Sequence, residues 1–199
     1  IYNKTDLLNW GANWGRYDHV ILMADIDMEE ELWTPVGDGD NWFCGVFDGN
    51  QKKIYNFNVN TDGYAGFIGH LAGSGCVKNL TIGSKDGINY DGKSTIVHTP
   101  SKDEYGWNYV GVVAKLAGSA TVTGVTNYAE LSIPESEFKV KACMGGIAGI
   151  HQGSGTISQC TNAGSIDFMA ATGSNGINVI GGIVSKTDAA ATIENCTNS

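Results

Sequence analysis

The feature that most constrains this chain is an internal repeat. Four segments share a Gly-apolar-apolar-small pattern, and their first residues lie 45, 35 and 36 positions apart. The segments are residues 66–69, 111–114, 146–149 and 182–185. In each copy an aliphatic residue follows the first glycine by 11 positions: Val77, Val122, Ile157 and Ile193. A constant offset inside the copies, with length changes only between them, indicates a stacked architecture in which each copy packs on the next.

The copies consist of short β-prone runs, such as 64–70 and 77–82, separated by Gly, Ser, Asn and Asp turns. Helical periodicity is absent from them, so we predict an all-β solenoid over residues 43–199. A more divergent copy is expected from Gly45 to Phe57, with residues 48–50 as a tight turn between two strands.

Stacked copies place equivalent residues in ladders. The prediction puts one apolar column inside the stack, where cysteine acts as a small buried hydrophobe: Leu80, Val125, Cys160 and Cys196. A second set is expected to form side-chain ladders or turn caps: Asn127, Asn162 and Asn198.

Residues 1–42 do not follow the repeat, and we expect them to cap the open end of the stack. Thr5 is the expected N-cap of a short helix that Gly11 and Gly15 end, and residues 19–24 resemble a strand. At least two of four tryptophans are expected to be buried in the cap core, and an exposed remainder is a second candidate partner site. The four are Trp10, Trp14, Trp33 and Trp42.

Charge and cysteine content exclude several functions. Lys and Arg total 12 against 21 Asp and Glu, for a formal net charge of −9, which opposes binding to nucleic acids and disfavours polyanionic substrates. No apolar run is long enough for a membrane span, and the first residues show no signal-peptide pattern. Five cysteines without a CxxC pair argue against a disulfide framework and a zinc site. We expect no metal and no cofactor.

Catalytic constellations are not evident. A glycosidase needs two carboxylates across a groove, but the pairs Asp25/Asp27 and Asp38/Asp40 fall in predicted turns, where Asp makes local hydrogen bonds. A lyase for uronic acids would need basic groups, and Arg16 is the sole arginine. His70 and His151, at positions +4 and +5 after their repeat glycines, are expected at a corner or exposed face. His19 and His98 make no metal-binding pattern with them. We therefore predict that the chain is not an enzyme.

A ligand-binding site is predicted in the segment 82–109, which accounts for the 45-residue spacing. Insertions in repeat proteins map to loops on one face and often bind ligands. Aromatic and polar residues there have the composition of a sugar-stacking patch: Glu104, Tyr105, Trp107, Asn108 and Tyr109. The alternative is that Trp107 and Tyr109 pin the loop onto the stack.

Several segments resemble GLUG-repeat surface proteins of gut Bacteroidetes: residues 6–8, 22–27, 33–37, 45–50, 54 and 195–198. Gly66-Phe67-Ile68-Gly69 and Gly146-Ile147-Ala148-Gly149 approximate the family's Gly-Leu-any-Gly motif, whereas the copies ending in Ala114 and Ser185 depart from it. The resemblance implies a right-handed parallel β-helix-like fold, secretion or surface display, and an adhesin-like role, and it brings no settled catalytic residues.

The leading functional prediction is a non-enzymatic surface or secreted module that binds a glycan or a protein partner. We expect a monomeric segment of a longer chain, located outside the cell or on its surface. Two alternatives stay open: a structural stalk or spacer, and a divergent polysaccharide-active enzyme.

Overall fold

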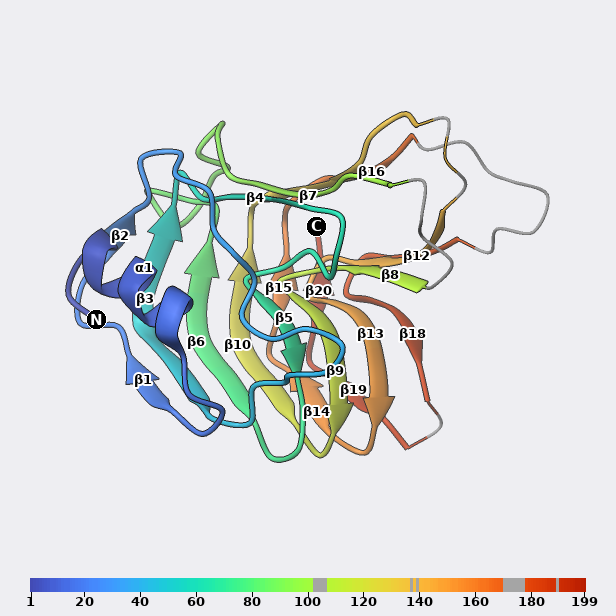
Figure 1. The fold of residues 1–199 in the computed structure, drawn as a ribbon, viewed down its shortest axis with the longest axis horizontal. Coiled ribbons are helices and arrows are strands. Elements are labelled where there is room, and N and C mark those ends of the chain that lie inside the picture. The colour runs from blue at the N-terminus through green and yellow to red at the C-terminus, as the bar shows by residue number, and fades with distance from the viewer. Residues whose placement is uncertain (102–106, 137, 139, 170–177, 189) are drawn as a thin grey trace.

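The computed structural model describes residues 1–199 except 102–106, 137, 139, 170–177 and 189. It is mostly β, with one short helix, α1 (Lys4–Asn13), at the N-terminal end. Strands from successive copies lie side by side, and the chain advances across the molecule from α1 on one side toward β18 on the other (Figure 1).

The described strands form four parallel sheets. The first contains β1 (His19–Ile21), β2 (Ile26–Asp27), β3 (Val46–Tyr55), β6 (Cys76–Ile82), β10 (Thr121–Asn127), β14 (Thr156–Ser158), β15 (Thr161–Asn162), β19 (Thr192–Glu194) and β20 (Thr197–Asn198). The second contains β4 (Asn58–Thr61), β7 (Thr95–His98), β11 (Glu130–Ile133) and β16 (Ile166–Phe168). The third contains β8 (Trp107–Val110), β12 (Lys141–Gly145) and β17 (Val179–Gly181). The fourth contains β5 (Ile68–Leu71), β9 (Val113–Gly118), β13 (Ala148–Gly153) and β18 (Val184–Thr187).

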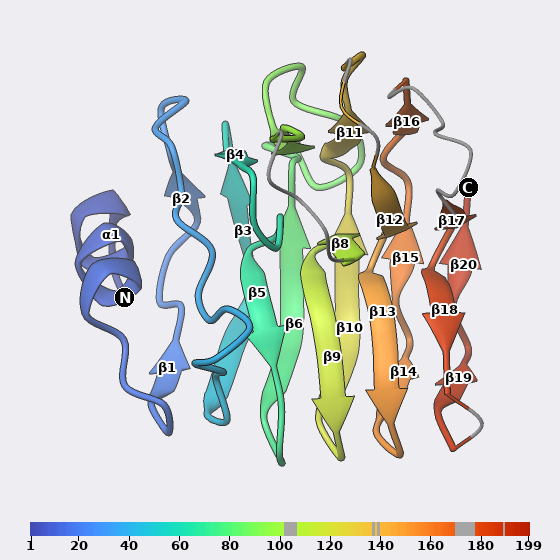
Figure 2. The ribbon, with the colours of Figure 1, turned by 45° about the vertical axis from the view of Figure 1, so that its right-hand side comes forward.

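The chain visits these sheets in a fixed order. From β5 in the fourth sheet it passes to β6 in the first, β7 in the second and β8 in the third, and then returns to the fourth at β9. Each copy of the repeat thus adds one strand or pair of strands to each sheet, and Figure 2 shows the layers in succession. This arrangement of parallel sheets is consistent with a β-helix-like fold.

Strand register confirms the repeat. Val122 pairs with both Val77 and Ile157, and Ile157 pairs with Ile193. Leu80 pairs with Val125, and the following threonines, from Thr81 to Thr197, align across four strands. In the predicted apolar column Leu80, Val125 and Cys160 are buried, while Cys196 in the last layer is half-buried. The side-chain period of two residues makes this register the one that keeps apolar groups inside.

The asparagine ladder is also confirmed. The Asn127 amide donates to Asn162 Oδ1 at 2.8 Å, and the Asn162 amide donates to Asn198 Oδ1 at 2.9 Å. Asn127 and Asn162 are buried, and each also donates to a backbone carbonyl two residues ahead. The buried side-chain amides of Asn127 and Asn162 are therefore paired, as burial requires.

The predicted tight turn at residues 48–50 is wrong. β3 runs through it as one strand, and its pairing with β6 shifts register between Asp48 and Lys52. Asp48 stabilises this bulge by accepting hydrogen bonds from the Asn50 amide and the Asn79 side chain. Val46 pairs with Cys76, so this copy matches the second part of the later copies and Gly45 is not the counterpart of Gly66.

The cap helix differs from its prediction at both ends. Asn3, not Thr5, is the N-cap and accepts from the Asp6 amide at 2.9 Å. The helix continues through Gly11 to Asn13. Glycine at this position allows the helix to pack closely on Trp33, since a Cβ there would lie 2.5 Å from the Trp33 ring. The strand expected over residues 19–24 is limited to β1, which pairs with β3, as β2 does.

Aromatic rings fill the cap core. Trp33 stacks on Phe67 at 5.1 Å between ring centroids, and Phe47 meets Phe67 edge-on at 4.8 Å. Only Trp33 of the four cap tryptophans is fully buried, so the expectation of at least two is wrong. Trp10 stays half-buried because its indole N–H donates to Asp18 at the surface.

Candidate functional site

The structure places the predicted binding residues on a strand of the repeat and not on its insertion. Trp107, Asn108 and Tyr109 belong to β8, whose partner is β12 of the next copy. Glu104 and Tyr105 lie outside the described residues.

The additional residues lie earlier, between β6 and β7. Ile82 and Thr95 are 13 positions apart, whereas their partners Asn127 and Glu130 are 3 apart. The insertion is thus the loop 83–94. Asp86 organises its turn by accepting from the Asn89 side chain and from two backbone amides, and these bonds hold the pKa of Asp86 well below its usual range. Tyr90 is exposed beside a hollow of about 410 Å³.

Around β8, side chains from several layers form a second cluster outside the main core. We call Tyr64, Trp107, Tyr109, Lys115 and Lys186 the outer aromatic cluster. The Tyr64 and Tyr109 rings meet edge-on, with centroids 5.0 Å apart. Tyr109 also packs against small and aliphatic side chains of the third and fourth sheets: Ala114, Cys143 and Ile150. Trp107 and Tyr64 flank this packing and are half-buried.

The two predicted aromatic residues, Tyr109 and Trp107, differ in burial and therefore in role. Tyr109 is 8% exposed, so it anchors β8 as the packing alternative predicts. Burial, followed by the nearby Tyr64 and Cys143, raises the pKa of Tyr109 to about 12, so its phenol stays protonated at neutral pH. Trp107 is half-buried, so part of this residue stays accessible, as a binding residue requires.

Cations lie over these rings. The Lys186 ammonium lies 5.4 Å from the Trp107 centroid. The Lys115 ammonium lies 5.9 Å from the Tyr64 centroid and 6.0 Å from that of Tyr109. At these separations the ring quadrupole attracts the cation and holds its flexible stem in place.

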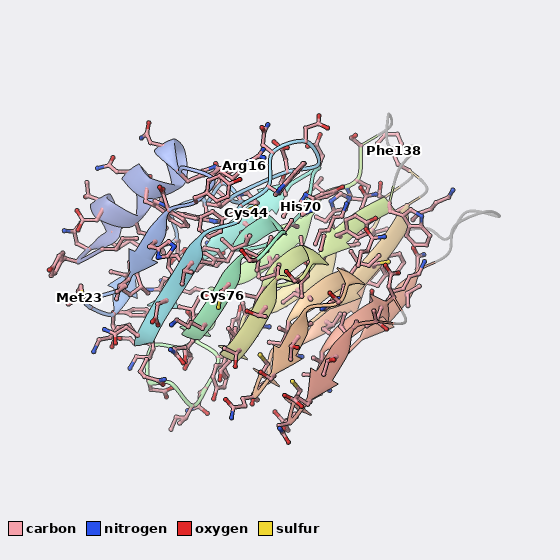
Figure 3. The ribbon with its side chains drawn as sticks, turned by 90° about the horizontal axis from the view of Figure 1, so that it is seen from below. Arg16, Met23, Cys44, His70, Cys76 and Phe138 are labelled. Atoms are coloured by element: carbon pink, nitrogen blue, oxygen red, sulfur yellow. The ribbon has the colours of Figure 1, made fainter. Side chains whose placement is uncertain are left out.

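A row of rings continues from Tyr64 toward the N-terminal end. His70 lies 6.2 Å from Tyr64 and 5.8 Å from Trp42, measured between centroids, and the Arg16 guanidinium lies 4.6 Å from the Trp42 centroid. Arg16 and His70 lie close together on one side of the stack (Figure 3). His70 Nδ1 hydrogen-bonds the Asp38 carbonyl at 2.7 Å, and burial lowers the pKa of His70.

Sequence reasoning missed Tyr64, Lys115 and Lys186, although the repeat contained a signal for them. Tyr64 and Tyr109 both lie two positions before a repeat glycine. The position four after that glycine is occupied by His70, Lys115, Ile150 and Lys186, which are aligned across the fourth sheet. Long polar residues in three of the four copies at this position indicate an outward-facing row, which Ile150 interrupts.

The histidine expectation is wrong, because both His70 and His151 are buried. Their one-residue offset in the repeat places them on opposite faces of the fourth sheet: His70 aligns with Lys115, and His151 aligns with the core residue Leu116. Within the described residues, no group of three or more His, Cys, Asp or Glu side chains is arranged to hold a metal ion.

Asp38 makes the predicted local turn contacts, whereas Asp27 lies in β2 and Asp25 and Asp27 also contact the next layer, so the prediction of a turn is wrong for Asp27. Asp38 accepts from the Asp40 and Asn41 amides, and Asp27 accepts from the Glu29 amide. Asp25 pairs with Lys53 at 3.2 Å. These contacts are those of turn-forming and strand-bridging carboxylates.

A second hollow, of about 550 Å³, lies in the cap between α1 and residues 31–34. Trp14 and Trp33 line it, and Leu32 at its edge is exposed. The hollow has no cation over an aromatic ring, in contrast to the outer aromatic cluster.

No family model matches the sequence, so the resemblance to GLUG-repeat proteins stays a prediction. The chain is 35% identical over 96 residues to a protein of Evansella cellulosilytica named "Putative Gly-rich membrane protein". That match covers 44% of this chain and 11% of the relative, so the chain spans about a tenth of the relative's length.

The fold is similar to the crystal structure of a "putative immunoglobulin A1 protease" from Bacteroides ovatus, with a TM-score of 0.52 and 22% identity. The match covers 98% of this chain and 66% of that one, and at this identity the likeness concerns the fold alone. In the described part of the chain, no helix has the length and apolar character that crossing a bilayer requires.

Proposed function

We propose that this chain is a non-enzymatic carbohydrate-binding module of a secreted or cell-envelope protein, with a right-handed β-helix-like solenoid as its scaffold. The observation that carries the proposal is the outer aromatic cluster, in which the half-buried Trp107 lies near Tyr64, Lys115 and Lys186.

The chemistry of the cluster suits sugars. The apolar face of a sugar ring packs on a flat aromatic side chain, while nearby donors bind its hydroxyls. Trp107 supplies the flat ring, and the two ammonium groups and tyrosine hydroxyls supply donors. Strand β8 pairs in register with β12, so Trp107 is held on a strand and not on a loop, which limits the loss of chain entropy on binding.

Other observations support the remaining parts of the proposal. The names of the two similar proteins, one a membrane protein and one a protease of a Bacteroides species, favour an envelope or secreted location. The carboxylate pairs engaged in turns support a role without catalysis.

The proposal is tested by binding of the folded chain to a glycan array, followed by calorimetric titration of each positive glycan. Trp107→Ala is expected to weaken binding on the order of tenfold to a hundredfold, as truncation of a central aromatic residue does. Trp107→Tyr keeps a flat ring and is expected to retain part of the affinity. Tyr90→Ala, an exposed aromatic residue on the insertion, is the matched control and is expected to bind like the wild type.

Thermal melts establish that each variant is folded. Equal binding by the wild type and a folded Trp107→Ala variant would place any sugar site elsewhere. If the folded wild type binds no glycan, the second candidate function gains support: a structural spacer, which the in-register stacking and the asparagine ladder favour.

A further inference from the structure

Among the residues that the structure describes, the lysines of the outer aromatic cluster lie over rings and not beside carboxylates. The chain has 12 Lys and Arg against 21 Asp and Glu, and some of its cations pair with a carboxylate. Lys4, Lys53, Lys78 and Lys93 have such partners. Within the described ranges, Lys115 and Lys186 enter no ion pair and lie over aromatic rings instead.

The two lysines are also regularly placed. Lys115 aligns with Ile150, and Ile150 aligns with Lys186, so two strand spacings separate the two lysine positions. At about 4.8 Å per spacing, their backbones lie about 10 Å apart along the stack. Lys141 adds a third cation, because it is exposed and aligned with Trp107 on the neighbouring strand of the third sheet.

From this arrangement we infer that the ligand of the outer aromatic cluster is an acidic glycan, whose carboxylate or sulfate groups pair with Lys115, Lys141 and Lys186 while a sugar ring packs on Trp107. The inference rests on the proposed carbohydrate-binding function and narrows it to one class of ligand. It departs from the expectation, drawn from the net charge, that polyanionic ligands are disfavoured.

Cations over aromatic rings are suited to such a ligand. A lysine already paired with a carboxylate would have to exchange that partner, whereas a lysine over a ring can accept a ligand anion and keep its ring contact. The N-terminal end of the row is less suitable, because the carboxylates of Asp38 and Asp40 lie near Tyr64; burial, followed by these two carboxylates, raises the pKa of the Tyr64 phenol. The acidic groups of the glycan are therefore expected toward the Trp107 end.

The test compares matched oligosaccharides by calorimetric titration: oligogalacturonate for carboxylates, a sulfated galactan oligosaccharide for sulfates, and a neutral galactan of equal length. The folded wild type is expected to bind at least one acidic glycan on the order of tenfold or more tightly than the neutral one. In the double variant Lys115→Ala, Lys186→Ala, the ratio of acidic to neutral affinity is expected to fall by a similar factor.

Two further variants make the result specific. Lys186→Arg keeps the charge and is expected to keep the preference. Lys85→Ala removes a lysine that lies 6.0 Å from the Tyr55 centroid, a similar cation and ring pair elsewhere, and is expected to leave the ratio unchanged.

The outcomes separate this inference from the proposed function. Binding of neutral and acidic glycans with equal affinity, or a ratio that the lysine substitutions do not change, overturns the acidic preference and leaves the carbohydrate-binding proposal in place. Absence of binding to every glycan by the folded wild type overturns both.

Discussion

At the scale of single residues, the glycine that opens a repeat copy contacts the ladder asparagine of the same copy, which accounts for both residue types. A Cβ on Gly146 would lie 2.1 Å from Asn162 Cγ, and a Cβ on Gly182 would lie 2.3 Å from Asn198 Cγ. The glycine that opens each of these copies therefore leaves room for the amide of the buried ladder. Where Ile82 replaces the asparagine in the register, the ladder ends. Sequence reasoning found both residue types but not their contact, because they are 16 positions apart in the chain.

His151 gives a testable pH dependence. It takes an interior position in a column that Leu71 and Leu116 occupy in the preceding layers, and among the described residues neither of its ring nitrogens has a hydrogen-bond partner. Burial lowers its pKa below the ordinary value of 6.5. Just below pH 6.5 the unfolded chain therefore binds more protons than the folded chain. The stability that the neutral, buried His151 side chain contributes is present above that pH and is lost as the pH falls.

We predict that the melting temperature falls between about pH 7.5 and about pH 5, and that the fall is smaller in His151→Leu, which cannot bind a proton. His19→Leu removes an exposed histidine and is the control. Thermal melts of the three chains at both pH values are the measurement, and an unchanged fall in His151→Leu would contradict this account of His151.

At the scale of elements, the repeat period predicted the positions of strands correctly, whereas residue preferences for turns and helix ends did not predict the bulge in β3 or the end of α1. The offset of 11 positions located β6, β10, β14 and β19, because stacking requires apolar residues in register. The bulge in β3 could not be read from its Asp-Gly-Asn sequence, since the same residues favour a tight turn in the absence of a neighbouring strand. The helix passed through Gly11 because tertiary contact with Trp33 outweighs the low helix propensity of glycine.

In the candidate site, too, only part of the prediction from sequence agrees with the structure. Trp107, Asn108 and Tyr109 were identified by composition, but the reason given for them, the length of the insertion, belongs to the loop 83–94. The contact of Lys186 with the Trp107 ring joins residues that are two layers apart in the stack, so the local sequence around Trp107 cannot indicate it.

The insertion can therefore be tested by excision. Deleting residues 83–92 leaves Lys93 and Ser94 as a two-residue connection, the length found between β10 and β11. The Ser94 hydroxyl that accepts from the Phe57 amide is kept, whereas the Asp91 acceptor of the Asn56 amide is lost. We expect a folded chain, less stable by about 1–3 kcal/mol, with glycan affinity within about twofold of the wild type. Loss of binding by the folded deletion variant, measured by calorimetry, would assign the site to the insertion.

At the scale of the whole molecule, net charge and local charge lead to different expectations. The formal charge of −9 repels anions at long range, but at physiological ionic strength this repulsion is screened beyond about 8 Å. A bound acidic glycan would experience mainly the lysines it contacts. The molecule can therefore carry a local cationic and aromatic surface on an acidic scaffold, and composition alone does not exclude an acidic ligand.

The central claim concerns where the ligand lies, and a crystal structure of the folded chain with a bound acidic oligosaccharide tests it most directly. The account predicts that a sugar ring packs on Trp107 and that the acidic groups contact Lys115, Lys141 or Lys186. An oligosaccharide bound instead in the cap hollow beside Trp14, or along the loop 83–94, would contradict it.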